Sequence, residues 1–139
     1  MKTIRLACMS LGLLILLTCS CKKTLDKEKE NYLLGVLTEG TWFLQNYSEN
    51  ELDYTYFFSA FTFKFYDNGT VDARTTTETV SGTWVGDINN LTFTVNFPAS
   101  NIQLAKLNHV WQWTRSNIGL IFAEHVTSSQ KKTIRLQKQ

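Results

Sequence analysis

Few side chains in this sequence could carry acid–base, nucleophilic or metal chemistry. The chain has two histidines, His109 and His125, and three cysteines, Cys8, Cys19 and Cys21. A zinc site needs three or four histidine, cysteine or carboxylate ligands, and no cluster with that spacing follows residue 20. A glycine-rich phosphate loop and a Gly-x-Ser-x-Gly nucleophile elbow are also missing from the sequence. We therefore expect a protein without enzymatic activity, cofactor or metal ion.

His109 is the histidine best placed for a functional role. It alternates with Trp111 and Trp113, so all three side chains should point to one face of a strand. A satisfied histidine in the interior or at the rim of a domain fits this position, and so does the polar group of a small-molecule pocket. His125 stands beside Glu124 in a polar stretch that predicts a turn.

The first 20 residues predict an export signal rather than part of a folded domain. Lys2 and Arg5 give a basic start. Residues 11–17 form an apolar core that is too short to anchor the chain across a bilayer. A Cys-Ser-Cys sequence follows at residues 19–21.

The end of this signal resembles the lipobox of bacterial lipoproteins, in which a small residue precedes the cysteine that is lipidated. Ser20 before Cys21 fits that pattern, and Cys19 is the competing site. Removal of residues 1–20 leaves 119 of the 139 residues and no second cysteine for a disulfide. Cleavage of the signal also removes two of the 14 basic residues, so the remaining 12 balance the 12 acidic residues. A side-chain charge near zero gives no reason to expect a nucleic-acid partner.

Residues 21–31 predict a charged tether between the lipidated cysteine and the folded domain. Lysine, aspartate and glutamate dominate from Lys22 to Glu30, and Leu25 is the only large apolar residue there. A solvated segment of this kind lifts a domain off the lipid, although a charged run can also bind a partner. A single folded domain is then expected over residues 32–139.

The central part of the chain alternates apolar and polar residues with the period of β-strands. Phe61, Phe63 and Phe65 occupy every other position and are followed by an Asp-Asn-Gly turn at residues 67–69. After a second turn at residues 87–90, the apolar positions are Leu91, Phe93, Val95 and Phe97. Sequential strands with one apolar face each predict an antiparallel meander.

Shorter patterns on both sides of this region predict the remaining elements. A helix over residues 31–37, ending before Gly40, should cover one end of the sheet. Further strands are expected over residues 41–47, 107–114, 118–122 and 131–136, with the inward residues Trp42, Leu44, Leu107, Ile118, Leu120, Phe122, Ile134 and Leu136. The segment from Tyr54 to Phe58 is aromatic throughout, and its pattern fits either a strand or a mobile loop.

About eight short, regularly spaced strands indicate an all-β barrel or sandwich. Every connection between them can be a local hairpin, whereas a sandwich more often needs one long crossing connection. Closure into a barrel also removes exposed strand edges. We therefore predict an all-β, eight-stranded antiparallel up-and-down barrel with a short N-terminal helix.

Several of these segments resemble the lipocalin-like domain of small bacterial lipoproteins, a calycin-like β-barrel family. They are Gly40-Thr-Trp42, residues 63–71, residues 80–84, residues 91–95 and the strand over residues 107–111. In order and spacing they cover about residues 33–138. The resemblance implies a barrel whose better-known relatives hold a small apolar molecule. It also implies that Trp42 lies at a closed bottom and stacks on a late basic residue, Arg135, in a cation–π contact.

Large aromatic side chains dominate the predicted inward face. With this parity, Phe61, Phe63, Phe65, Trp84, Phe93, Trp111, Trp113 and Phe122 all point inward. They could fill the barrel or line a pocket, because an eight-stranded barrel is just wide enough for either. In the pocket interpretation, Tyr54 to Phe58 and Trp113 line an open mouth. The candidate ligand-binding residues are then Tyr54, Tyr56, Phe63, Trp84, Phe93, His109, Trp111 and Trp113.

These patterns together predict an exported protein that is lipid-anchored at the bacterial cell envelope, in the outer membrane. We expect membrane contact through acyl chains such as palmitate on Cys21. The barrel is expected to bind a small hydrophobic molecule without catalysing a reaction. The alternative is a solid-core protein-interaction module, or a subunit of an envelope complex, that binds no small ligand.

Overall fold

The computed structural model describes residues 34–139. The predicted signal peptide (residues 1–20), the lipidation site Cys21 with its alternative Cys19, and the charged tether (residues 21–31) lie outside these residues. The first part of the predicted N-terminal helix lies outside them as well. Within residues 34–139, no helix has the length and apolar character needed to cross a bilayer.

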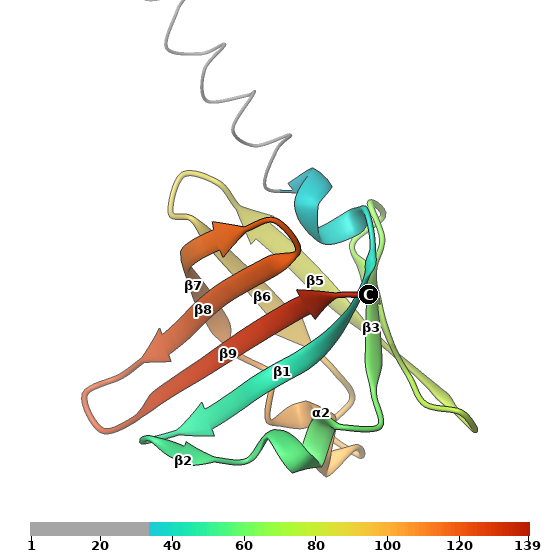
Figure 1. Cartoon of the computed structure of the whole chain (residues 1–139), viewed down its shortest axis with the longest axis horizontal. Coiled ribbons are helices and arrows are strands. Elements are labelled where there is room, and N and C mark those ends of the chain that lie inside the picture. The colour runs from blue at the N-terminus through green and yellow to red at the C-terminus, as the bar shows by residue number, and fades with distance from the viewer. Residues whose placement is uncertain (1–33) are drawn as a thin grey trace, which may run out of the picture.

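The described residues form one antiparallel sheet of nine strands, eight of which close into a barrel (Figure 1). From β3 to β9 each strand pairs with the next, β3 also pairs with β1, and β9 returns to pair with β1. The short β2 pairs only with the end of β1 and lies outside the ring. The strands are β1 (Thr41–Glu49), β2 (Leu52–Asp53), β3 (Thr62–Phe65), β4 (Thr70–Arg74), β5 (Thr79–Asp87), β6 (Thr92–Asn96), β7 (Val110–Asn117), β8 (Leu120–Val126) and β9 (Lys131–Lys138). The predicted eight-stranded antiparallel barrel is confirmed.

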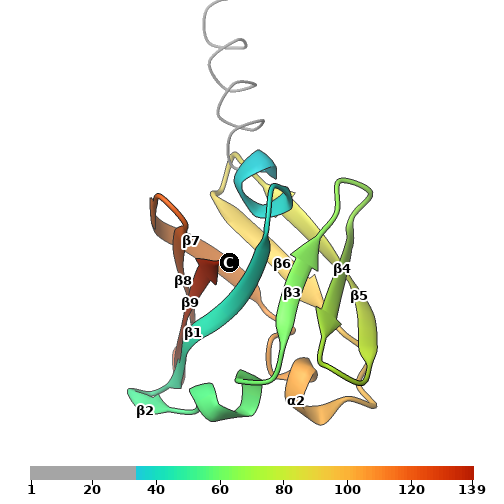
Figure 2. The same cartoon turned by 45° about the vertical axis from the view of Figure 1, so that its right-hand side comes forward.

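Short helical segments cover both ends of this barrel (Figures 1 and 2). The upper end carries the helical residues 34–38 and the turns of the β3–β4, β5–β6 and β7–β8 hairpins. The opposite, lower end carries β2, the 3₁₀ helix η1 (Thr55–Phe58) and the helix α2 (Ile102–Ala105). The helix before β1 was predicted, whereas η1 and α2 were not. α2 begins at Asn101, whose side-chain oxygen accepts a hydrogen bond from the backbone N–H of Leu104 at 3.0 Å.

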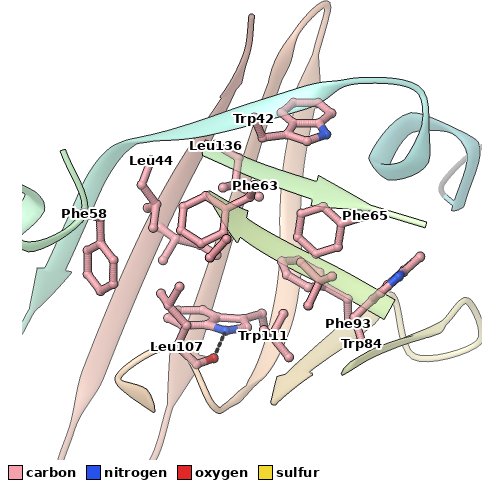
Figure 3. Close-up of a cluster of buried hydrophobic side chains, with 14 of the residues drawn as sticks. Trp42, Leu44, Phe58, Phe63, Phe65, Trp84, Phe93, Leu107, Trp111 and Leu136 are labelled. Carbon is pink, nitrogen blue, oxygen red and sulfur yellow. Dashed lines mark hydrogen bonds between the residues drawn. The ribbon is translucent and has the colours of Figure 1, made fainter. Parts of the chain in front are cut away.

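Most of the predicted inward residues do face the interior, as a period of two requires. In β3, for example, Phe63 and Phe65 are buried, while Thr62 and Lys64 are only partly so. The prediction is confirmed for Trp42, Leu44, Phe61, Phe63, Phe65, Trp84, Phe93, Val95, Phe97, Leu107, Trp111, Ile134 and Leu136, each at most 5% exposed. These side chains belong to one apolar core (Figure 3).

β8 has the opposite parity to the predicted one. Ile121 and Ala123 are buried in the core, whereas Leu120 and Phe122 are only partly buried. Ile118 lies in the turn before β8 and is fully exposed. The prediction that Ile118, Leu120 and Phe122 point inward is therefore wrong, because the small Ala123 and not the large Phe122 marks the inner face.

Phe122 is held on the outer wall by two guanidinium groups. The Arg115 and Arg135 guanidinium carbons lie 4.2 and 4.9 Å from the centre of its ring. Such cation–π contacts stabilise an exposed ring by about 0.5–1 kcal/mol each. The predicted stack of Arg135 on Trp42 is therefore wrong. The Trp42 side chain is buried, and its indole N–H donates to the Leu37 carbonyl at 2.8 Å.

β1 contains two inward patterns joined by an irregularity. Trp42 and Leu44 are inward, and the register against β9 then shifts between Leu44 and Asn46. Beyond the shift, Tyr47 is fully buried. A β-bulge adds one residue to a strand and so exchanges the inward and outward positions that follow it.

Two glycines on the inner face of β5 make room for neighbouring groups. A Cβ atom on Gly82 would lie 2.6 Å from the carbonyl oxygen of Asn96 and 2.8 Å from a ring carbon of Phe97. A Cβ atom on Gly86 would lie 2.5 Å from a methyl group of Leu34. The backbone and the packed ring around Gly82 cannot retreat, whereas the end of the Leu34 side chain can.

We expect Gly82→Ala to lower the free energy of unfolding by about 2 kcal/mol or more, because the added methyl group overpacks a rigid part of the core. Gly86→Ala is the matched control in the same strand and should cost about 1 kcal/mol or less, because Leu34 can change rotamer. Urea unfolding followed by tryptophan fluorescence measures both values. Equal losses in the two variants would contradict this description of β5.

Candidate functional site

The aromatic core is the site for which the sequence predicts ligand binding. Phe63, Trp84, Phe93 and Trp111 point into the interior from β3, β5, β6 and β7 (Figure 3). Their rings pack closely against neighbouring rings. The ring centres of Phe65 and Trp84, for example, are 5.5 Å apart with the planes nearly perpendicular. Edge-to-face packing of this kind is favourable for aromatic pairs.

Three buried indole N–H groups in this core already have acceptors. Each donates a hydrogen bond to a backbone carbonyl oxygen: Trp42 to Leu37 at 2.8 Å, Trp84 to Tyr66 at 2.9 Å and Trp111 to Leu107 at 2.9 Å. The last of these bonds is drawn in Figure 3. A buried donor without a partner is costly, so these bonds fix the three rings in place.

A cavity of about 20 Å³ remains among the core side chains, bordered by Phe63, Phe93, Val95, Trp111 and Leu136 among others. This volume is enough for about one water molecule, and the apolar walls offer that water no hydrogen bond. Pockets for small molecules typically have roughly 300 Å³ or more. The interior is therefore filled by the protein's own side chains.

The remaining candidate residues do not meet at one mouth. Tyr54 and Tyr56 lie beside and within η1 at the lower end. Trp113 lies toward the upper end, where it borders a small crevice together with Leu34 and Leu91. β1 runs from the upper to the lower end, so β2 and η1, which follow it, lie at the end opposite to Leu34. The predicted opening lined by Tyr54 to Phe58 and Trp113 is therefore wrong.

The aromatic segment from Tyr54 to Phe58 is a 3₁₀ turn rather than a strand. Phe58 is buried, and its ring packs edge-on against Tyr47 with 4.9 Å between ring centres. The other rings stack near the surface: the centres of Tyr56 and Phe57 are 4.3 Å apart, and those of Tyr54 and Phe57 are 6.1 Å apart. Phe58 thus fastens the turn to the core and leaves the other rings at the lower end.

A polar network centred on Glu49 also lies at the lower end. The Tyr47 hydroxyl donates a hydrogen bond to Oε1 of Glu49 at 2.6 Å. The ammonium groups of Lys106 and Lys132 lie 3.5 and 3.7 Å from the same oxygen. Lys132 is only 8% exposed and donates a hydrogen bond to Nε2 of His109 at 2.8 Å. The network thus joins β1, β9 and the connection between α2 and β7.

Burial and neighbouring charges keep His109 neutral. Burial is the main cause that lowers the His109 pKa from 6.5 to about 4. The charges of Lys132 and His125 act in the same direction, and the Glu49 carboxylate opposes them. The pKa of Glu49 is lowered, mainly by the Tyr47 hydroxyl and further by Lys132 and Lys106, whereas burial raises the pKa of Tyr47.

The neighbours of His109 in this network occupy its ring nitrogen Nε2 and one face of its ring. Nε2 of His109 accepts the Lys132 ammonium hydrogen, so this nitrogen is not available to take a proton from a substrate. The ring of His125 stacks on the ring of His109, with 4.4 Å between ring centres. Among residues 34–139, no group of three His, Cys, Asp or Glu side chains is arranged to hold a metal ion. The surroundings of His109 fit the interpretation as a satisfied rim histidine.

The sequence analysis did not identify Tyr47, Glu49, Lys106 or Lys132 as members of a site. They come from three segments that are far apart in the chain, and each is an ordinary polar residue in its local context. The only local signal is the spacing of Tyr47 and Glu49, which places two residues of one strand on the same face.

These features define a class of protein, a closed eight-stranded antiparallel barrel with a filled interior. A solved structure similar to this chain is that of a DUF4847 family protein from Bacteroides vulgatus ATCC 8482. The TM-score is 0.55 and the sequence identity 14%, over 77% of this chain and 99% of that one. At this identity the similarity supports the barrel fold alone. No protein-family model matches the chain, and no curated protein gives a significant match.

We expect the protein to lose stability as the pH falls from 6.5 to about 4, because the unfolded chain binds a proton at His109 in this range and the folded protein does not. The free energy of unfolding should drop by about 1–2 kcal/mol, less than the full pKa shift would give, because water partly screens the ring. His109→Gln keeps an acceptor for Lys132 and should flatten this dependence. Urea unfolding across the range measures both proteins, and parallel curves would contradict the assignment.

Proposed function

We propose that this protein is an envelope-anchored, non-catalytic lipoprotein whose solid barrel contacts another protein through its lower end. The observation that carries the proposal is the filled interior, because a cavity of about 20 Å³ has no room for a fatty acid or a molecule of similar size. Of the two functions that the sequence predicts, this favours the interaction module or complex subunit over the carrier of a small hydrophobic molecule.

The lower end presents apolar side chains that suit a protein contact. Leu52 is 62% exposed and Tyr56 65% exposed, and the partly buried Tyr54 and Phe57 lie beside them. We call these four residues, three of which are aromatic, the lower aromatic group. Tyrosine and phenylalanine are enriched at protein interfaces. Because the rings are already stacked, binding would immobilise few additional side-chain rotamers.

Charged groups border the lower aromatic group. The Lys106 ammonium lies 5.5 Å from the centre of the Phe57 ring and 3.5 Å from the Glu49 carboxylate. Asp53 lies in β2, and its carboxylate accepts a hydrogen bond from the backbone N–H of Thr55 at 2.7 Å. An apolar centre with a mixed charged rim is typical of non-obligate interfaces, so the expected partner surface is apolar at its centre and polar around it.

The position of this group suits a protein anchored at its N-terminal side. Leu34, the first described residue, lies at the upper end, and the lower aromatic group lies at the opposite end (Figures 1 and 2). A chain lipidated at Cys21 would therefore hold the lower aromatic group away from the bilayer, where a protein partner can reach it.

We expect the double substitution Leu52→Ser and Tyr56→Ser to reduce recovery of a partner by about tenfold, as loss of interface hot spots does. Both side chains are mostly exposed, so the fold should be retained. Val85→Ser is the matched control, because Val85 is 67% exposed on the outer wall in β5. Affinity capture from crosslinked, solubilised cell envelopes with quantitative mass spectrometry measures the recovery.

Two results would count against this function. The first is equal recovery of the same partner by the double variant and the wild type. The second is a saturable change in tryptophan fluorescence when palmitate is added to the purified domain, because entry of a ligand into the barrel must move Trp84 or Trp111. That result would favour the carrier of a small hydrophobic molecule.

We expect Cys21→Ser to move the full-length protein from the membrane fraction to the soluble fraction of the cells, because stable anchoring depends on the acyl chains. Cys19→Ser is the matched control and should leave the protein in the membrane fraction. Incorporation of an alkyne analogue of palmitate measures lipidation directly. The reverse pattern would assign lipidation to Cys19, and absence of label from the wild type would exclude the anchor.

A further inference from the structure

Two hairpin turns at the upper end place apolar side chains in solvent. Ile118, in the β7–β8 turn, is fully exposed, and Leu91, in the β5–β6 turn, is 45% exposed. Leu91 also has a φ of 51°, a left-handed conformation that usually belongs to glycine or asparagine. Turn positions favour glycine, asparagine and aspartate, so two large aliphatic residues at neighbouring turns are unusual. The sequence analysis had placed both residues inward.

Trp113 lies next to these turns and differs from the other three tryptophans. Its ring is half-buried, with its centre 6.0 Å from that of Phe93, and its backbone N–H donates to the Leu91 carbonyl at 2.8 Å. The indole N–H has no acceptor within residues 34–139, whereas Trp42, Trp84 and Trp111 each have one. A tryptophan with one packed and one open side is the kind that gathers at membrane–water interfaces.

Leu91, Trp113 and Ile118 are three apolar residues toward the upper end of the barrel. Leu34, Ile88, Leu91 and Trp113 border a shared crevice of about 20 Å³. Ile118 lies farther along the chain, in the turn between β7 and β8. We call Leu91, Trp113 and Ile118 the upper apolar group. The helical residues 34–38 and the three upper hairpin turns lie on this same side (Figure 2).

The length of the chain outside the described residues limits how far this group can lie from a membrane. Twelve residues lie between Cys21 and Leu34, so 13 Cα–Cα steps join them. A chain of this length spans at most about 45 Å, whatever its conformation. An anchored barrel is therefore held near the bilayer through its upper end, and the resulting effective concentration favours even a weak surface contact.

The charges at the upper end are mixed in sign. Asp67 and Asp87 lie at the two hairpin turns beside the helical segment, and Arg115 and Lys138 lie near the third. These four residues do not form a large patch of positive charge, so they do not attract the surface to anionic lipid. Its apolar turns instead suit a zwitterionic bilayer, and the contact should depend little on salt.

We infer that the upper end of the barrel rests on the lipid bilayer, with Ile118 and Leu91 inserted among the acyl chains and Trp113 at the headgroup level. This inference rests on the proposed anchoring at Cys21. It assigns a fixed orientation to the barrel, with the upper apolar group in lipid and the lower aromatic group directed away from it.

The experiment uses the mature chain from residue 21, coupled through its single cysteine to a maleimide lipid in phosphatidylcholine–phosphatidylethanolamine vesicles. The lipids carry bromine on the acyl carbons nearest the headgroups, where it quenches the fluorescence of a tryptophan at the depth proposed for Trp113. We expect part of the emission to be quenched, and Trp113→Phe to remove that part. Ile118→Asp should reduce the quenched fraction by about tenfold, because the inserted apolar side chain is replaced by a charge.

Val126→Asp is the matched control, because Val126 is 60% exposed at the far end of β8. It should leave the quenching unchanged, as should an increase in salt. Absence of quenching in the wild type, or an equal loss in Ile118→Asp and Val126→Asp, would overturn the orientation. Since the coupling is chemical, this result does not depend on lipidation in the cell, which the Cys21→Ser experiment decides separately.

Discussion

The hydrogen-bonding demand of three buried tryptophans limits how this barrel can be built. Each indole N–H must find an acceptor inside an apolar core, and each finds a backbone carbonyl in a segment that borders one end of the barrel. These carbonyls belong to Leu37, Tyr66 and Leu107. The rings that fill the interior thus also fasten the segments that close it. The centre of the barrel is therefore occupied by the protein's own rings.

The fold was predictable from the sequence wherever inward residues were large and outward residues polar. This holds for Phe63 and Phe65 in β3 and for Ile134 and Leu136 in β9. The prediction failed in β8, where two guanidinium groups hold Phe122 outside and the small Ala123 faces inward. Cation–π contacts between distant strands leave no trace in the local alternation of apolar and polar residues.

The candidate sites were less predictable because they depend on contacts between distant parts of the chain. His109 was identified, but its partner Lys132 is 23 residues away and comes from the end of another strand. The two ends of the barrel were also confused, because alternation indicates which face a residue occupies but not which end of a strand it approaches. Tyr56 and Trp113 were therefore assigned to one opening, whereas the structure places them on opposite sides.

The pairing of β1 with β9, which closes the barrel, has a consequence for how the protein folds. Side chains that meet across β1 and β9, such as Ser48 with Thr133 and Gln45 with Gln137, are 85 and 92 positions apart in sequence. The other strand pairs form between segments that are near in sequence. Pairing of β1 with β9 is therefore expected to be the last and slowest step of folding. Until then β1 and β9 offer unpaired backbone groups to any passing chain. The yield of folded protein therefore depends on how fast β1 pairs with β9 compared with how fast two partly folded chains associate.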